Sequence, residues 1–383
     1  MTSENVKGFR DFTGTDALKR EKIKEIVIEI FKRYGFEPAE TPVIEYEDFV
    51  KGQNTGDEAI SDIFKLQDKG KRNLALRYEF TFQLKRISQN KKLPYKRYQI
   101  GEVFRDEPVS ANRLRQFTQC DADIIGSSIK DEAEILAMAS RILKKLGIRA
   151  DIFVNNRKLL NEILDKEGVK DKVQVIREID KLDKLPESII KSNLEKYNAG
   201  KILSIFKKPE GFFKKYDSYN EIKELKKLCS LYNVKAIFQP SLARGLSYYN
   251  GTIFEIKTKD IRESICAGGS YLVNSIQACG ISFGLERISN FAKVDFEDKR
   301  ILVISIGEDK KALKLAEKLR QENKQVIVMC GKPTKALEFA NSYGIKKVIF
   351  IGKEEIQKNK IKLRNMKTGK EKLVSEPELI KSL

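Results

Sequence analysis

The chain has 383 residues, of which 41% are hydrophobic and 34% are charged, which is typical of a soluble globular protein with two or three domains. No apolar run is long enough to cross a bilayer, and the first residues form no signal peptide, so we expect a cytoplasmic protein with no membrane contact. The net charge of +19 favours a nucleic-acid partner, although a lysine-rich composition with solvated side chains would give the same value.

Two residue types narrow the possible chemistry. The sequence contains no histidine, which removes the commonest general base and metal ligand. The reaction must therefore use arginines, carboxylates, a metal ion or the substrate itself. The five cysteines are scattered, odd in number and without a CxxC pair, so we expect reduced thiols rather than disulfides or a zinc site.

The first predicted element is an amphipathic helix. Apolar residues recur at helical spacing from Ile23 to Tyr34, and Gly35 follows as a stop signal. An extended segment over residues 41–44, which contains a proline, comes next. A buried core helix followed by an edge strand would show the same pattern.

A second predicted strand, over residues 74–81, runs into a helix that starts near Phe82. It ends with Glu79 and Thr81. A carboxylate beside a hydroxyl group suits a cationic ammonium ligand. The alternative is a surface glutamate at a helix start, which the helix dipole also favours.

Residues 97–126 predict two antiparallel strands joined by a long polar loop. In the returning strand, spacing of period two places an aromatic, an amide and two carboxylates on one face. Such a face suits a small polar ligand better than a core. These four residues are Phe117, Gln119, Asp121 and Asp123.

The loop of this hairpin is rich in arginine. Arg105, Glu107, Arg113 and Arg115 lie at its end, where guanidinium groups could hold anionic phosphates. A solvated hairpin in a basic protein would also carry arginines and acids at its tip. It would not explain an aromatic residue on the polar face.

Three stretches resemble motifs of the class II aminoacyl-tRNA synthetases. The order F-R-x-E followed by R-x-R-Q-F-x-Q, at residues 104–119, resembles motif 2 of the histidyl-tRNA synthetases. The first helix and the extended segment resemble motif 1, which builds the dimer interface in this class. Residues 76–81 resemble the family's L-R-P-E-x-T segment, with Tyr78 where proline is common.

The middle of the chain changes character. A helix over residues 131–146 and a strand over residues 152–154 precede residues 155–232, which have short helical pieces and no readable motif. We expect an inserted helical module. The family carries such an insertion between motifs 2 and 3, where it contacts the tRNA acceptor arm.

Residues 244–255, R-G-L-S-Y-Y-N-G-T-I-F-E, resemble the signature peptide of the histidyl-tRNA synthetases. Their Asn-Gly pair predicts a hairpin turn. Residues 267–272 resemble A-G-G-R-Y-D, and residues 280–288 resemble motif 3, a strand followed by a helix. The chain departs from the family pattern at Ser247, Ser270 and Leu272, where the family has aspartate, arginine and aspartate.

From residue 300 onward, strands and helices alternate, which predicts a parallel sheet. Residues 298–383 hold 21 Lys and Arg against 11 Asp and Glu, a net charge of +10 that suits RNA. No glycine-rich loop follows the first of these strands, so a nucleotide-binding Rossmann unit is disfavoured. The segment resembles the anticodon-binding domain of several class II synthetases.

The resemblance implies an α+β class II synthetase catalytic core with an antiparallel sheet and a helical insertion, followed by an α/β anticodon-binding domain. The core would comprise residues 1–154, with motifs 1 and 2, and residues 236–297, with the signature peptide and motif 3. The insertion would be residues 155–235, and the anticodon-binding domain residues 298–383. The family is dimeric, and we expect a homodimer.

The resemblance also implies a reaction. ATP and L-histidine would form histidyl-adenylate and pyrophosphate, and the histidyl group would then pass to the terminal ribose of tRNA(His). Catalysis would fall to Arg105 and Arg244, which contact the α-phosphate. ATP would be bound by Arg105, Glu107, Arg113, Phe117 and Arg287, with Mg²⁺ bridging the phosphates. Histidine would be bound by Glu79, Thr81, Gln119, Asp123, Arg244, Tyr249 and Tyr271.

Two other interpretations remain open. A non-catalytic paralogue, of the type of the regulatory subunit of ATP phosphoribosyltransferase, would keep the core but lose the signature arginine and the tRNA domain. An RNA-binding protein with an inactive core would keep the basic domain but not ATP binding. The retained arginines oppose the paralogue, while the three departures favour it.

The absence of histidine suggests that this protein could be translated when charged histidyl-tRNA is scarce. Biased codon usage or engineering would leave the same composition. Restoring several surface histidines should therefore lower expression under histidine limitation, relative to the unchanged protein, when the two yields are compared. Equal yields would refute the hypothesis.

Overall fold

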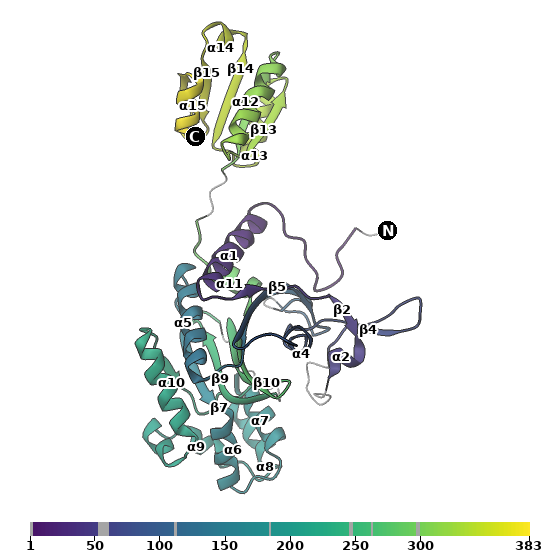
Figure 1. Ribbon diagram of the computed structural model, residues 1–383, viewed down its shortest axis with the longest axis vertical. Coiled ribbons are helices and arrows are strands. Elements are labelled where there is room, and N and C mark those ends of the chain that lie inside the picture. Colours follow the sequence, from purple (N-terminus) through teal and green to yellow (C-terminus); the bar gives the residue numbers. More distant parts are fainter. Residues whose placement is uncertain are drawn as a thin grey trace. The chain divides into compact units, whose positions relative to one another are not determined.

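The computed structural model describes residues 3–52, 61–110, 113–183, 185–244, 248–261, 263–295 and 299–383 (Figure 1). The chain divides into an N-terminal unit, Met1–Val294, and a C-terminal unit, Asp295–Leu383. The boundary predicted between residues 297 and 298 lies outside the described residues. Among the described residues, no helix is long and apolar enough to span a membrane.

The N-terminal unit is built on one large sheet. Within the described residues, this sheet has eight strands, and all neighbouring pairs except the two outermost are antiparallel. The predicted hairpin is confirmed as the antiparallel pair β5–β6. In spatial order the strands are β1 (Glu37–Pro38), β5 (Tyr95–Phe104), β6 (Gln116–Ile125), β11 (Ile276–Gly284), β10 (Cys266–Val273), β9 (Tyr249–Lys257), β7 (Asp151–Asn156) and β8 (Ala236–Phe238).

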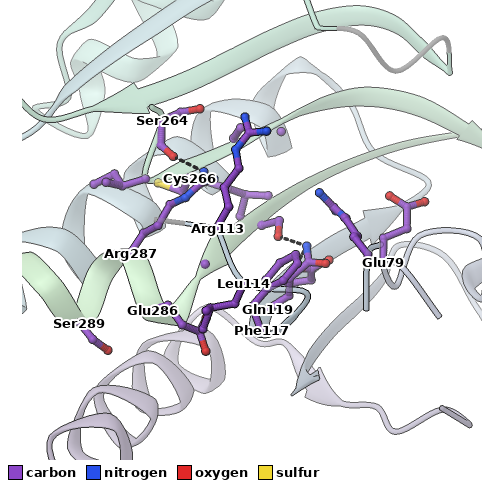
Figure 2. A pocket seen from close by; sticks show the side chains of 18 of the residues that line it. Glu79, Arg113, Leu114, Phe117, Gln119, Ser264, Cys266, Glu286, Arg287 and Ser289 are labelled. Carbon is purple, nitrogen blue, oxygen red and sulfur yellow. Dashed lines mark hydrogen bonds between the residues drawn. The ribbon is translucent and has the colours of Figure 1, made fainter. Parts of the chain in front are cut away.

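The two faces of this sheet differ in chemistry, as the alternation along β6 predicts. Cys120, Ala122 and Ile124 are fully buried in the core cluster that also contains the apolar residues of α1 (Gly14–Arg33) and α5 (Ile129–Lys145). The opposite face carries Phe117 and Gln119, which line a pocket (Figure 2). One strand therefore contributes both to the core and to the pocket floor.

The segment predicted as a helical module is helical. It contains α6 (Arg157–Lys166), α7 (Lys172–Asp180), α8 (Glu187–Glu195), α9 (Ile202–Phe206) and α10 (Tyr219–Leu231), with short 3₁₀ turns at Lys181–Asp183 and Glu210–Lys215. Its buried apolar residues belong to the same core cluster as those of the large sheet. The segment therefore packs as part of the N-terminal unit, and its separation at residues 155 and 235 stays a prediction.

The hairpin predicted at the Asn-Gly pair is wrong, because both residues lie inside β9. The Asn250 side chain exchanges hydrogen bonds with that of Gln277 on β11, at 3.1 and 3.2 Å. Gly251 faces Ser270 on β10, so that an added Cβ would lie 3.3 Å from the serine Cβ. Pairing with the neighbouring strands thus overrides the local turn preference.

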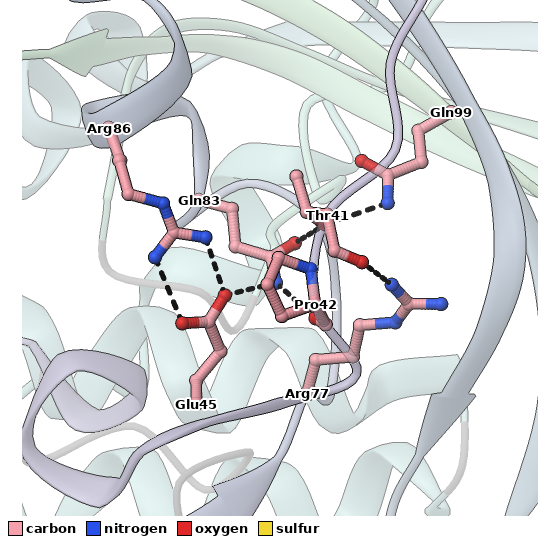
Figure 3. Close-up of polar contacts among 7 residues, drawn as sticks. All are labelled: Thr41, Pro42, Glu45, Arg77, Gln83, Arg86 and Gln99. Atoms are coloured by element: carbon pink, nitrogen blue, oxygen red, sulfur yellow. Dashed lines mark hydrogen bonds and ion pairs between the residues drawn. The ribbon is translucent and has the colours of Figure 1, made fainter.

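A second, small sheet consists of β2 (Ile44–Tyr46), β4 (Asn73–Leu76) and β3 (Lys65–Gln67), near the short helices α2 (Glu47–Lys51) and α4 (Leu84–Ile87). A polar network joins it to the large sheet (Figure 3). The buried Glu45 carboxylate accepts hydrogen bonds from Arg86, at 2.7 and 2.9 Å, and from Gln83, at 2.9 Å. Thr41 then links Gln83 to Gln99 of β5.

The C-terminal unit has a mixed sheet. The predicted parallel strands are present as β12 (Ile301–Ile306), β13 (Val326–Cys330) and β14 (Lys347–Gly352), with α12 (Asp309–Gln321) and α13 (Pro333–Ser342). Two antiparallel strands, β15 (Ile361–Asn365) and β16 (Glu371–Val374), extend this sheet and were not predicted. The helices α14 (Lys353–Gln357) and α15 (Glu376–Ser382) complete the unit.

Replacement of Glu45 tests the network between the two sheets. We expect Glu45→Ala to lower the free energy of unfolding by about 1–3 kcal/mol, because it removes a buried acceptor shared by Arg86 and Gln83. The control Glu37→Ala breaks a half-exposed pair with Lys91 and should change it by no more than about 0.5 kcal/mol. Urea denaturation measures both, and equal effects would show that the network is not stabilising.

Candidate functional site

A cavity of about 470 Å³ lies on the polar face of β6. Its walls come from the β5–β6 hairpin, the segment after β4, the strands β9, β10 and β11, and the start of α1. The structure brings all the sequence-predicted site residues together in this one cavity. They are Glu79, Thr81, Arg105, Glu107, Arg113, Phe117, Gln119, Asp123, Arg244, Tyr249, Tyr271 and Arg287.

Asp123 lies at the floor of the cavity, directly opposite Gly280 in the pairing of β6 with β11. A Cβ added to Gly280 would lie 2.0 Å from the Asp123 Oδ1 atom, so the carboxylate occupies space that only a glycine leaves open. The Tyr271 hydroxyl donates a short hydrogen bond to Oδ1. Arg97 forms an ion pair with Oδ2 at 2.8 Å.

Two further buried carboxyl groups adjoin Asp123. Burial, with the nearby Asp123 carboxylate, raises the pKa of Glu79 to about 7, although Arg105 acts to lower it. Burial and Asp123 also raise the pKa of Asp121 to about 8. Three buried carboxyl groups therefore lie close together at the floor of the cavity. At neutral pH, a bound cation would displace protons from them.

Amide and hydroxyl groups complete this acidic part of the site. The Gln119 side chain donates a hydrogen bond to Ser282, and its Oε1 atom is buried without a partner among the described residues. The Tyr248 hydroxyl lies 3.5 Å from the Glu79 carboxylate. An unpartnered acceptor beside a carboxylate is suited to a ligand that brings N–H donors.

The other side of the cavity is basic. Arg113 pairs with Glu107 at 3.3 Å, and the guanidinium carbon of Arg105 lies 5.2 Å from the Phe117 ring centroid. Arg287 donates to the Ser264 carbonyl at 2.9 Å, and burial together with Arg113 lowers its pKa. Figure 2 shows Arg287 and Ser264 at one side of the cavity and Glu79 at the other.

Arg244 enters the cavity just before β9. Its Nη1 atom pairs with Glu255 at 2.8 Å, and Lys257 contacts the second oxygen of that carboxylate at 3.0 Å. Burial favours the neutral form of Arg244, yet Tyr249 and Glu255 raise its pKa above the usual range. The next residues, including the departure at Ser247, lie outside the described residues.

The other two departures from the family pattern lie away from the cavity. Ser270 is buried, does not line the cavity, and donates a short hydrogen bond to the carboxyl group of Glu132, whose pKa burial raises. Leu272 is half exposed. Neither Ser270 nor Leu272 lines the cavity.

Sequence reasoning missed the part of the wall formed by the N-terminus. Arg10, Phe12, Asp16, Lys19 and Arg20 all line the cavity. The Gly8 carbonyl accepts hydrogen bonds from the backbone N–H groups of Arg115, at 2.9 Å, and Gln116, at 3.2 Å. The segment K-G-F-R-D-F was visible in the sequence, but nothing in it indicated a contact with the arginine-rich loop.

This N-terminal segment holds the loop closely. Gly8 has a φ of +88°, and a Cβ there would lie 2.8 Å from Arg115 and 2.9 Å from Val109. The Phe9 ring contacts Phe64 and Phe104. The close approach of Gly8 thus fixes the base of the loop that carries Glu107 and Arg113.

Among the described residues, no group of three or more His, Cys, Asp or Glu side chains is arranged to hold a metal ion.

Comparisons with known proteins agree on one family. Residues 8–288 match the family model described as histidyl-tRNA synthetase, and residues 300–383 match the anticodon binding domain. Histidine–tRNA ligase 1 of Bacillus cereus is 37% identical over 420 residues, which cover 97% of each chain.

Solved structures share the fold. A histidyl-tRNA synthetase from a Nostoc species superposes over 100% of both chains, with a TM-score of 0.85 and 24% identity. A Bacillus halodurans protein described as an ATP phosphoribosyltransferase regulatory subunit/histidyl-tRNA synthetase covers 88% of this chain and 96% of its own, with a TM-score of 0.75 and 19% identity.

The acidic floor predicts a pH-dependent stability. Glu79 and Asp121 have pKa values in the folded state above those of the unfolded chain, so the folded state binds extra protons between about pH 5 and about pH 8. Stability should fall as the pH rises through this window. Glu79→Gln should remove about 2–3 kcal/mol of this fall.

Urea denaturation at several pH values measures this effect. The exposed Glu167→Gln is the matched control and should leave the pH profile unchanged. A profile for Glu79→Gln that is as steep as that of the unchanged protein would contradict the assignment.

Proposed function

Because the chain belongs to the histidyl-tRNA synthetase family, we propose that it is a histidine–tRNA ligase with a working class II site. The carboxylate of L-histidine attacks the α-phosphorus of ATP, which gives histidyl-adenylate and releases pyrophosphate. A ribose hydroxyl at the 3′ end of tRNA(His) then attacks the carbonyl carbon, which gives histidyl-tRNA and releases AMP.

The observation that carries this proposal is the separation of charge within one cavity. Figure 2 shows Arg287 on one side of the cavity and Glu79 on the other, and the buried Asp121 and Asp123 lie close to Glu79. A triphosphate needs the first surface, and an amino acid with an ammonium group needs the second. The two substrates would thus be held with the histidine carboxylate directed toward the α-phosphate.

The acidic side would bind histidine. Glu79, Thr81 and Gln119 would accept hydrogen bonds from the α-ammonium group, which supplies the cation that these buried acceptors lack. Asp123 would accept the N–H of one imidazole nitrogen, and Tyr249 would contact the other. Tyr271, already bonded to Asp123, would close over the ring.

The basic side would bind ATP. Arg105 and Arg244 would hold the α-phosphate and stabilise the charge that develops on it in the transition state. Arg113 and Arg287 would take the outer phosphates. The adenine ring would stack on Phe117, opposite Arg287, and its amino group would donate to Glu107.

Mg²⁺ would arrive with ATP and be held mainly by phosphate oxygens, as this ion usually is. The carboxylates near the basic side could contribute little to binding of the ion, because Glu107 pairs with Arg113 and Glu286 pairs with Arg20. The ion would neutralise charge on the outer phosphates.

The C-terminal unit supports a role in tRNA binding. Its residues 300–383 match the anticodon binding domain, and residues 298–383 carry a net charge of +10. We propose that this unit binds the anticodon arm, that the protein is a homodimer, and that it acts in the cytoplasm without membrane contact.

A non-catalytic role receives little support. The paralogue interpretation requires loss of the signature arginine and of the tRNA domain. Arg105, Arg244 and Arg287 all line the cavity, and two of the three departures lie outside it. The likeness to the Bacillus halodurans protein concerns the fold.

ATP–pyrophosphate exchange tests the proposed function. We expect exchange with L-histidine and not with the other amino acids. Arg244→Ala should lower its rate about 10²- to 10³-fold, because a donor to the transition-state charge is lost. Arg33→Ala, which changes an exposed arginine of α1, is the control and should leave the rate unchanged.

The outcomes separate the alternatives. Exchange with another amino acid would show that the acidic side recognises a different side chain. A folded protein that binds tRNA but shows no exchange would favour the inactive-core interpretation.

A further inference from the structure

Arg97 is the feature of the site that no motif accounts for. Its side chain is 0% exposed, and it comes from β5, the strand paired with β6. Arg97 does not line the cavity, whereas Asp123, its ion-pair partner at 2.8 Å, does. The guanidinium group therefore lies behind the pocket floor, where it cannot touch a ligand directly.

The contacts of Arg97 hold Asp123 from the back. Its Nη2 atom forms the ion pair with Asp123 and also donates to the Phe80 carbonyl at 3.1 Å. Among the described residues, its Nε and Nη1 atoms have no hydrogen-bond partner. A fully buried cation that leaves two donors unsatisfied is costly to the folded state.

The carboxylate of Asp123 is contacted at both oxygens. Arg97 pairs with Oδ2 at 2.8 Å, Tyr271 donates to Oδ1, and a Cβ at Gly280 would lie 2.0 Å from Oδ1. Among the described residues, Oδ2 accepts no hydrogen bond. Each oxygen keeps a lone pair that these contacts do not use. Asp123 can thus accept one more hydrogen bond from a ligand in the cavity.

We propose that Arg97 is a positioning residue for histidine recognition, which pairs with Asp123 and keeps it in one orientation so that it accepts an N–H group of the imidazole ring. This inference rests on the proposed function. Asp123 would contact the imidazole ring of histidine, and Arg97 would act only by holding Asp123.

The surroundings of Asp123 explain why a cation is needed. Among the described residues, the titratable groups that face it are Asp121 on β6, Tyr271 on β10, Cys279 on β11, Glu79 after β4 and the cation Arg97 on β5. Burial raises the pKa of Asp123, and Arg97 opposes that rise. Without Arg97, burial would raise the pKa of Asp123 further, which would weaken the carboxyl group as a hydrogen-bond acceptor.

A structural role alone would give a different pattern. Arg97 also ties β5 to the segment after β4 through Phe80, so its loss should destabilise the protein in either case. Arg77 is the matched control, because it is 5% exposed and donates only to the backbone carbonyls of Thr41 and Glu102. It does not line the cavity.

The experiment measures ATP–pyrophosphate exchange and KM for histidine and for ATP in Arg97→Met, Arg97→Lys and Arg77→Met. We expect Arg97→Met to raise the KM for histidine at least about tenfold while the KM for ATP stays within about twofold. Arg97→Lys, which keeps the charge, should show a smaller increase. Arg77→Met should leave both KM values within about twofold of the unchanged protein.

The pH profile supplies a readout that a loss of packing would not move. In Arg97→Met, the KM for histidine should fall as the pH rises, because Asp123 then ionises without its partner. Arg97→Lys should lack this dependence. Equal changes in both KM values, or a pH profile identical to that of Arg77→Met, would overturn the inference.

A double variant tests the role of Arg97 if Arg97→Met does not fold. Arg97→Met with Asp123→Asn removes both charges, so no carboxylate is left buried without a partner. Its KM for histidine should equal that of Asp123→Asn alone, because both residues act through one acceptor. An additive increase would overturn the inference. Absence of histidine-dependent exchange in the unchanged protein would instead refute the proposed function.

Discussion

The site depends on the burial of three carboxyl groups on one floor. Glu79, Asp121 and Asp123 are buried close together, and Asp123 disfavours the ionisation of both Glu79 and Asp121. The fold neutralises only part of this charge, through Arg97 behind the floor and Arg105 at its edge. A ligand with a cationic group would balance the remaining charge, as in the proposed binding of the histidine ammonium group.

The large antiparallel sheet brings acidic and basic side chains into one cavity. One hairpin contributes to both surfaces, because β6 carries Asp121 and Asp123 while the loop between β5 and β6 carries Arg105 and Arg113. The loop is long, and the N-terminal segment restrains it through the Gly8 carbonyl. Rigid strands and a restrained loop together favour a fixed orientation of two substrates, which is the requirement for transfer between them.

Much of this could be predicted from the sequence, and the failures have physical reasons. Alternation along β6 placed its polar residues on the correct face, since a strand repeats every two residues. The Asn-Gly pair was misassigned because Gln277, distant in sequence, engages Asn250. Arg97 gave no signal, because an arginine between Lys96 and Tyr98 reads as a surface residue, and only the tertiary fold shows that it is buried. The contact of Gly8 with the loop was also missed, because only the tertiary fold brings these two segments together.

Proton release on histidine binding would show directly whether the acidic floor binds the ammonium group of histidine. L-Histidine would be titrated calorimetrically into the protein at about pH 7, in buffers that differ in ionisation enthalpy. We expect a net release of protons, because the ammonium group displaces protons from Glu79 and Asp121. In Glu79→Gln the release should be smaller. Net uptake of protons, or binding that involves none, would contradict the acidic floor as the site of histidine recognition.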